Sequence, residues 1–192
     1  GGIALIGTPL QARKKIPDSP ERALADWLRF GELDPDDHWP LAWARHYVEH
    51  SRSQVYDWLL GEGIGFMPAV NWVERGLNGD GNSLPRYHVV WGTSRHMTLR
   101  LIEQLRAAGA GGKLTVLHRH RVTGLVHAGG VLAGAVATDE ASGQQVQLQA
   151  PVVVLAMGGI NGGHAEARRN WLRDRPMPAR MLNGAHPFAD GE

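Results

Sequence analysis

The sequence lacks cysteine entirely, which excludes disulfide bonds and metal sites built on thiolates. It also lacks any run approaching the roughly 20 apolar residues that a helix needs to cross a bilayer. The opening GGIALIGTPL has no basic flank before its apolar part, so it does not resemble a secretory signal peptide. Together these absences predict a cytoplasmic protein without a membrane span.

An excess of charge of either sign is absent as well. Lys and Arg number 20 against 19 Asp and Glu, which gives a net charge of +1 with the histidines neutral. Proteins that bind nucleic acids or anionic membranes through their surface rely on a strong positive balance. The composition therefore predicts no nucleic-acid partner.

Neither end of the sequence has the features of a domain end. The chain begins without Met, and it stops at FADGE with no element that would close a fold. We therefore expect a segment of a larger protein. With 43% hydrophobic and 20% charged residues, that segment has the composition of a globular domain.

What the sequence has in abundance is glycine, with 25 residues, and tryptophan, with seven. The glycines gather in clusters that follow no fixed period, at residues 1–2, 61–65, 76–81, 109–112, 129–134 and 158–163. Such clusters predict loops and close backbone approaches, and they exclude a collagen-like or solenoid repeat.

Three helices are predicted in the first half of the chain. One begins at Ser19 with Pro20 in the first helical position, a second spans 41–60, and a third spans 94–108. The expected inner face of the second helix comprises Ala44, Val48, Val55, Trp58 and Leu59. Residues 66–92 follow no clear period, so we expect a long loop there that is functional or mobile.

From residue 113 onward the hydrophobic period changes to two, which is typical of strands. Glycine turns at 129–130 and 142–143 divide the stretch, so residues 113–150 are predicted to form an antiparallel meander. In QQVQLQ the apolar residues alternate with glutamine, so one face of that strand is expected to be exposed to solvent.

A different kind of strand is predicted at 152–156, where VVVLA contains no polar residue. Such a run is typical of a strand buried on both faces, as in a parallel sheet. It leads to Gly158 and Gly159, where bare main chain offers N–H groups to an anionic dinucleotide. The alternative is a plain tight turn packed on a helix, and the glycines alone do not distinguish the two.

Several stretches in this order carry a family resemblance. Residues 156–159 read Ala-Met-Gly-Gly, and residues 122–134 hold the strand pair before them. Together with residues 1–14, 82–93 and 164–182, they resemble the fumarate reductase and 3-ketosteroid Δ1-dehydrogenase class of FAD-dependent oxidoreductases. The bacterial FAD-binding dehydrogenase branch of that class is the most similar, and the resemblance covers nearly the whole chain.

The resemblance implies an α/β fold, namely a three-layer (ββα) FAD/NAD(P)-binding domain with a parallel sheet, an antiparallel β-meander and a helical insertion. This chain would be an incomplete part of it. Residues 1–112 would form the mainly helical and loop insertion, 113–150 the meander, and 151–192 the buried strand with its Gly-Gly turn and the following segment.

The resemblance also implies a cofactor and a reaction. The cofactor would be FAD, and the parent enzyme would transfer a hydride between FAD and a substrate C–H bond or activated C=C bond. A steroid-like enone and a dicarboxylate are both precedents in the class for the small-molecule substrate.

Residue roles follow from the resemblance as well. Gly1 and Gly2 would lie against the isoalloxazine ring, the backbone of Val122 would meet the adenine with Arg121 beside it, and Trp91 would line the flavin or substrate side. Core packing is the alternative for Val122 and for Trp91. The implied cofactor-binding residues are Gly1, Gly2, Arg121, Val122, Ala156, Met157, Gly158 and Gly159.

The sequence departs from the class in three respects. The G-x-G-x-x-G fingerprint and its acidic ribose ligand are absent from this stretch. Met157 replaces the usual small hydroxyl residue, and no residue in the usual proton-transfer positions is present, so the catalytic residues stay unassigned. The alternative function is therefore a non-catalytic module that binds a nucleotide or a partner without flavin.

Histidines give the remaining candidates. His118 and His120 share a strand face, but no third ligand is spaced to complete a metal site, so no metal is predicted. His88 is either a proton donor near the flavin or a structural histidine whose ring nitrogens are hydrogen-bonded.

Overall fold

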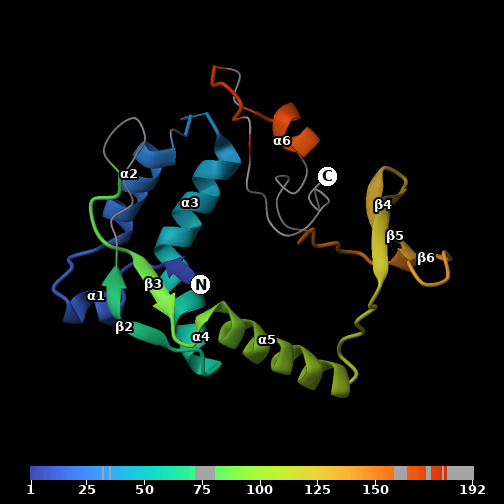
Figure 1. Cartoon of the computed structure of the whole chain (residues 1–192), viewed down its shortest axis with the longest axis horizontal. Helices are drawn as coiled ribbons and strands as arrows, with labels where there is room; N and C mark the ends of the chain where they lie inside the picture. Colours follow the sequence, from blue (N-terminus) through green and yellow to red (C-terminus); the bar gives the residue numbers. More distant parts are fainter. Residues whose placement is uncertain are drawn as a thin grey trace. The chain divides into compact units, whose positions relative to one another are not determined.

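The computed structural model describes residues 1–31, 33–34, 36–71, 81–157, 164–171, 174–178 and 180. The chain forms two compact units, residues 1–116 and 117–192. Among the described residues, each unit has one three-stranded antiparallel sheet, and most of the helical residues belong to the first unit (Figure 1). The fold is therefore α/β.

The helices of the first unit include the three predicted from the sequence. In chain order they are α1 (Pro9–Arg13), α2 (Pro20–Gly31), α3 (His38–His50), the π-helix η1 (Ser51–Tyr56), α4 (Asp57–Gly61) and α5 (Thr93–Ala110). The predicted start at Pro20 is confirmed, because the Ser19 hydroxyl accepts a hydrogen bond from the N–H of Arg22 at 3.3 Å.

The sheet of the first unit consists of β1 (Gly2–Ala4), β2 (Phe66–Asn71) and β3 (Tyr87–Val90), in the order β1-β3-β2. The expected long loop over 66–92 is therefore wrong at both of its ends. Two short strands occupy the ends, and strands of this length give too few residues for a period to be visible. Residues 72–80 lie outside the described residues.

The second predicted helix is divided by the π-helix η1, and this changes which side chains face inward. Ala44, Val48 and Leu59 are buried as predicted, but Trp58 is exposed. A π-helix closes its hydrogen bonds over five residues instead of four, which rotates the following turn relative to an α-helix. The prediction assumed an unbroken α-helical period, and it therefore placed Trp58 on the inner face, where the structure does not have it.

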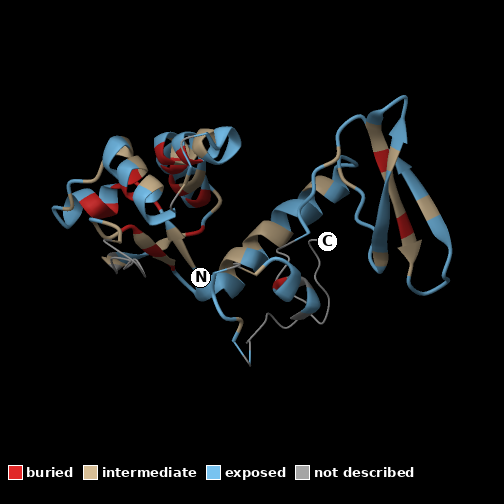
Figure 2. Cartoon of the chain, turned by 90° about the horizontal axis from the view of Figure 1, so that it is seen from above, coloured by how far each residue is buried: buried red, intermediate tan, exposed pale blue. Residues whose placement is uncertain are grey.

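Three small hydrophobic clusters make up the core of the first unit. Their buried members are Leu5, Leu10 and Tyr56 in the first, Ile6, Ala23 and Val48 in the second, and Leu59, Ile64 and Val90 in the third. Ile3, Val55 and Phe66 pack against both the first and the third cluster. Figure 2 shows buried residues of this unit, in red, on its helices and on its sheet.

The second unit contains the predicted meander, formed by β4 (His120–Ala128), β5 (Val131–Asp139) and β6 (Gln145–Gln149). Gly129 and Gly130 make the first turn with φ of 58° and 81°, which confirms the predicted hairpin. The first strand begins at His120, later than predicted. Arg119, the residue before it, has a φ of 58°, which lies outside the extended region, so the strand does not continue toward the N-terminus.

The predicted buried strand at 152–156 is wrong for the described structure. These residues have no regular secondary structure, and the side chain of Val154 is 81% exposed. A strand that is apolar on both faces needs a neighbouring strand and a covering layer on each side. Among the described residues no strand pairs with this segment. The helix α6 (His164–Arg169) follows it.

Of the helices described, none combines the length and the apolar composition that crossing a bilayer requires.

Candidate functional site

The predicted glycine pair, Gly1 and Gly2, lies on an edge strand. Within the described residues β1 has β3 on one side only. The carbonyl of Gly1 accepts from the N–H of Val90 at 3.0 Å, and the N–H of Leu5 donates to the carbonyl of Arg86 at 3.0 Å. Because antiparallel pairing alternates, Gly2 must direct its N–H and C=O away from β3. We call this side the free edge of β1.

Because the two glycines have no side chains, side chains of other residues lie close to their main chain. A Cβ on Gly2 would overlap the phenol ring of Tyr87, and a Cβ on Gly1 would meet the hydroxyl of Ser94. The sequence interpretation expected a cofactor to use this space. The structure fills it with the side chains of Tyr87 and Ser94, whereas the free edge of Gly2 has no paired strand among the described residues.

The chain that leaves β1 is held by hydrogen bonds from three elements. The hydroxyl of Tyr47 donates to the carbonyl of Ala4 at 2.8 Å, and burial raises the pKa of Tyr47, so the hydroxyl stays protonated. The hydroxyl of Ser51, the first residue of η1, accepts from the N–H of Ile6 at 3.3 Å. Thr8 caps α1 through a reciprocal pair of hydrogen bonds with Gln11. These contacts fix the position of β1.

His88 is fully buried, and both of its ring nitrogens are hydrogen-bonded. Nδ1 lies 2.7 Å from the carbonyl of Arg86, so it must carry the proton. Nε2 then accepts from the hydroxyl of Thr8 at 2.7 Å. Burial lowers the pKa of His88, although the carbonyl of Arg86 and the charge of Asp18 act in the opposite direction. This geometry supports the structural interpretation of His88 over a role as proton donor.

A buried ion-pair network lies beside His88. Arg86, which is only 4% exposed, donates to both oxygens of Asp18 at 2.8 and 2.9 Å and to Asp26 at 2.7 Å. Asp26 also accepts from the N–H and the hydroxyl of Ser83 at 2.8 and 2.7 Å. The network therefore joins α2 to the chain that enters β3, which is the strand that positions β1.

The network sets the charge state of Asp26. Burial by itself would raise the pKa of Asp26, but the hydrogen bonds from Ser83 and Arg86 and the charge of Arg86 lower it to about 2. Asp26 is therefore ionised throughout the physiological range. The sequence analysis missed this network. The signal that could have revealed the network is Asp26 itself, an acidic residue three positions after Ala23 on the inner face of the amphipathic helix α2.

Two further predicted contacts, Arg121 and Val122, are neighbours on β4. The guanidinium of Arg121 pairs with the carboxylate of Glu140 at 2.9 Å, and both side chains are exposed. Val122 is 51% exposed, so it is not a core residue of the part of the chain that the structure describes. The register of β4 against β5 shifts between Val122 and Gly124, so the backbone is irregular at the predicted adenine contact.

Of the remaining predicted residues, four belong to the stretch of sequence after β6, and the fifth, Trp91, precedes α5. Ala156 and Met157 are exposed in a segment without regular structure, and Gly158 and Gly159 lie outside the described residues. Trp91 is 61% exposed, so it does not belong to the core formed by the described residues.

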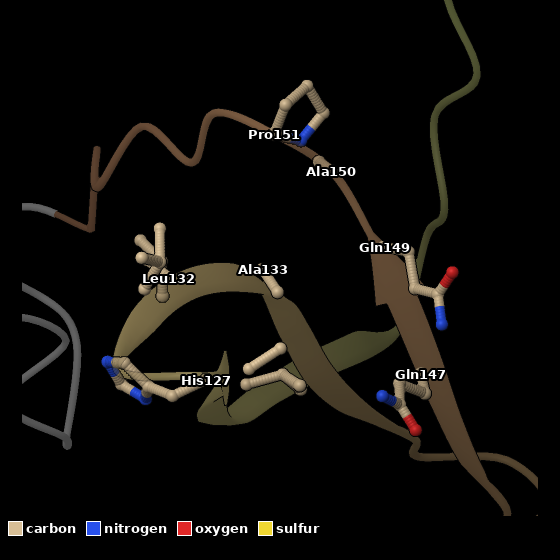
Figure 3. A pocket seen from close by; sticks show the side chains of 10 residues that line it. His127, Leu132, Ala133, Gln147, Gln149, Ala150 and Pro151 are labelled. Carbon is tan, nitrogen blue, oxygen red and sulfur yellow. The ribbon is translucent and has the colours of Figure 1, made fainter.

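The meander carries an open groove of about 860 Å³. In Figure 3, His127 and Leu132 lie near the hairpin that joins β4 to β5, whereas Gln147 and Gln149 project from β6. Ala150 and Pro151 line the groove from the segment that follows β6. None of the ten lining residues is Asp, Glu, Lys or Arg, so the groove offers no fixed charge to a pyrophosphate.

In the part of the chain that the structure describes, no three His, Asp or Glu side chains gather in a way that could hold a metal ion. The Nδ1 of His120, the first residue of β4, donates to the carbonyl of His118 at 2.8 Å. His118 lies in the turn before β4, so the prediction that the two histidines share a strand face is wrong.

Comparison with known proteins identifies relatives over the full chain. The chain is 35% identical to a KsdD-like steroid dehydrogenase of Mycobacterium tuberculosis and 34% identical to one of Mycolicibacterium smegmatis, each in an alignment of 209 residues. Both alignments cover 100% of this chain but only 36% and 38% of the relatives. The chain therefore spans little more than a third of the length of the curated relatives it matches.

Solved structures with a similar fold include the open conformation of a flavocytochrome c3 fumarate reductase, with a TM-score of 0.65 and 24% identity. The match covers 84% of this chain and 26% of that one. The Sdh1 complex of Mycobacterium smegmatis in its apo form follows, with a TM-score of 0.61 and 20% identity over 84% and 27% of the two chains.

The FAD binding domain family matches residues 1–191. This match covers nearly the whole chain, so it argues against the alternative of a module that never had a flavin. It also agrees with the resemblance that the order of motifs indicated. The chain belongs to the FAD-binding domain family, and its cofactor is FAD.

Proposed function

We propose that this chain is part of a flavin-dependent dehydrogenase or reductase. The observation that carries the proposal is the 35% identity, over the whole chain, to a KsdD-like steroid dehydrogenase. When bound, FAD supplies a two-electron acceptor that takes up a hydride from a substrate C–H bond or returns it to an activated C=C bond. The protein's own residues would bind the flavin, orient it and keep it apart from water.

Gly2 is the residue of the first unit that best fits a flavin contact. Its N–H and C=O point to the free edge of β1, where a planar ring with polar edges could hydrogen-bond to them. Tyr87 occupies the face of Gly2, so the ring would approach edge-on to the strand. The hydrogen bonds of Tyr47 and Ser51 would keep this edge in place before the cofactor arrives.

The second unit would supply the contacts to the rest of the cofactor. The exposed backbone at Val122 would meet the adenine, with Arg121 beside it. Ala156 and Met157 would lead to the main chain at Gly158 and Gly159 for the pyrophosphate. We further propose that residues 1–192 belong to one FAD-binding domain with the three-layer (ββα) arrangement, and that the protein is cytoplasmic, as its lack of cysteine suggests.

Anaerobic titration of the full-length protein would test this function. The bound flavin is first released and identified by chromatography. The loaded protein is then mixed with the steroid enone androst-4-ene-3,17-dione, and the dithionite-reduced protein is mixed with fumarate. We expect the enone to bleach the visible flavin absorbance and fumarate to leave the reduced flavin unchanged.

Either of two results would overturn parts of this proposal. Reoxidation by fumarate without bleaching by the enone would assign the dicarboxylate as the substrate class. A flavin-loaded protein that reacts with neither compound would contradict both proposed substrate classes.

A further inference from the structure

Two histidines lie one turn apart on an exposed face of α3. His46 and His50 occupy positions i and i+4 of this helix, so their side chains project from the same face. Trp39 and Trp43 lie along that face as well and are 70% and 67% exposed, so the face is open to solvent in the described structure. The proposed function uses none of these residues.

The two imidazole rings lie at a separation that suits a shared metal ion. They are stacked, with centroids 4.3 Å apart and an angle of 21° between their planes. Zinc binds imidazole nitrogens at about 2.0–2.1 Å, so two such nitrogens on one ion lie no more than about 4 Å apart. A small tilt of the rings toward each other would bring one nitrogen of each ring into this range.

The hydrogen bonding of His50 leaves one ring nitrogen for a ligand. Its Nδ1 donates to the carbonyl of His46 at 2.9 Å, so Nε2 is the nitrogen that a metal could use. Histidines that bind metals almost always donate their other ring N–H to a carboxylate or a backbone carbonyl, which fixes the ring. Among the described residues, none is hydrogen-bonded to the ring of His46.

The ligand chemistry selects the kind of ion. Imidazole suits Zn²⁺, Ni²⁺ and Cu²⁺, and a given nitrogen site holds Cu²⁺ most tightly of the three. Mg²⁺ and Ca²⁺ prefer oxygen ligands and should not compete. Because no third His, Asp or Glu of the described residues joins the pair, water would occupy the other coordination positions.

We propose that His46 and His50 form a binding site for a divalent transition metal ion, which holds Cu²⁺ more tightly than Ni²⁺ or Zn²⁺. An ion that bridges the last turn of α3 would stabilise the point where η1 begins. There the hydroxyl of Ser51 accepts from the N–H of Ile6 at 3.3 Å, so the ion would also strengthen a contact that holds the chain leaving β1. The site does not depend on the proposed reaction.

Isothermal titration calorimetry of the full-length protein, purified without a polyhistidine tag, would test this site with the chlorides of copper, nickel, zinc and magnesium. His46→Gln and His50→Gln each remove one ligand. His38→Gln is the matched control, because His38 begins the same helix but has Ala42 in place of a second histidine one turn later. Far-UV circular dichroism of each variant shows whether its fold is retained.

Tryptophan fluorescence gives an independent measure of where the ion binds. The ring of Trp43 lies 6.0 Å from that of His46, so Cu²⁺ bound at the pair should quench its emission. Trp43→Phe should reduce this quenching and leave the Kd of Cu²⁺ within about twofold. Quenching that is unaltered in this variant would place the ion elsewhere and overturn the inference.

The ligand substitutions should have the largest effect. Loss of a group that only orients a metal ligand costs about 10–100-fold in metal affinity, so loss of a ligand should cost at least about tenfold. We therefore expect His46→Gln and His50→Gln each to raise the Kd of Cu²⁺ by that factor, and His38→Gln to leave it within about twofold. Unchanged affinity in both ligand variants, an equal loss in the control, or no binding of Cu²⁺ to the unsubstituted protein would overturn the inference.

Discussion

The two units of this chain are stabilised in different ways. The first has three hydrophobic clusters and a buried network of ion pairs centred on Arg86. In the second, Ala137 and Ala167 are the only buried hydrophobic residues among those described, and Val122, Leu125 and Val131 are exposed on the meander. The meander depends mainly on the backbone pairing of β4 with β5 and of β5 with β6.

This difference bears on how each unit would contribute to a cofactor site. In the first unit, side chains from α1, α3 and η1 hold the chain that leaves β1, so the free edge at Gly2 is formed before any ligand binds. In the second, the predicted contacts at Arg121 and Val122 are on an exposed surface. Substitutions of the same kind in the two units should therefore have unequal effects.

The largest expected difference comes from the two arginine ion pairs. Arg86→Met leaves Asp18 and Asp26 buried without their cation, and it should destabilise the first unit by about 3–5 kcal/mol. Arg121→Met breaks an exposed pair and should cost no more than about 1 kcal/mol. Native-state hydrogen exchange of amides in each unit measures both values, and equal losses would contradict the comparison.

Glycine substitutions give the next difference. Gly2→Ala places a methyl group into the ring of Tyr87, so we expect a loss of about 1–3 kcal/mol. The double variant Gly2→Ala/Tyr87→Ala removes the overlap and should recover part of this loss. Gly124→Ala on β4 meets open space, and it should be neutral or stabilising by up to about 1 kcal/mol. Failure of the Tyr87 substitution to compensate would exclude the overlap as the cause.

The pH dependence should also differ between the units. The pKa of Asp26 is about 2 in the folded chain, against about 3.9 in an unfolded chain. A lowered pKa stabilises the fold above the unfolded value, and this contribution is lost as the pH falls toward the folded value. We expect the first unit to lose about 2 kcal/mol between pH 5 and pH 2 through Asp26.

Asp26→Asn should remove that part of the pH dependence, and an unaltered profile in the variant would contradict the assignment. In the second unit, the hydroxyl of Ser142 lowers the pKa of Asp139, but this residue is only partly buried and, among the described residues, it forms no ion pair like that of Asp26 with Arg86. Asp139→Asn is therefore the matched control, for which we expect little change in the profile.

The smallest effect is expected from a valine on the meander. Val122→Thr alters a half-exposed side chain and should change the stability of the second unit by less than about 0.5 kcal/mol. Val90→Thr, in the sheet of the first unit, buries a hydroxyl in a cluster and should cost about 1–3 kcal/mol. Thermal unfolding monitored in each unit would compare the two, and a reversed order would show that the meander has a core of its own.

The sequence predicted the elements whose signals are local. Ser19 and Pro20 begin α2, and Gly129 and Gly130 turn the hairpin, because capping and turn geometry depend on adjacent residues. The resemblance in the order of motifs led to the correct family, although no single motif would have been enough.

What the sequence could not predict depends on contacts between distant residues. The network of Asp18, Asp26 and Arg86 joins positions up to 68 residues apart, and no periodicity reveals such a pairing. The π-helix η1 shifts the helical phase, which an α-helical pattern cannot anticipate. The cofactor contact at Gly2 stays a prediction. What the sequence does not reveal is that the missing side chain of Gly2 makes room for Tyr87, which lies opposite Ala4 on β3.

The central proposal is that the free edge of β1 receives the flavin. A crystal structure of the full-length protein with FAD bound tests it through one distance, from the main-chain nitrogen or oxygen of Gly2 to the nearest polar atom of the isoalloxazine ring. We predict a hydrogen bond, which means a distance of about 2.7–3.2 Å. A flavin placed elsewhere, with the edge of Gly2 covered by other protein atoms, would contradict the account.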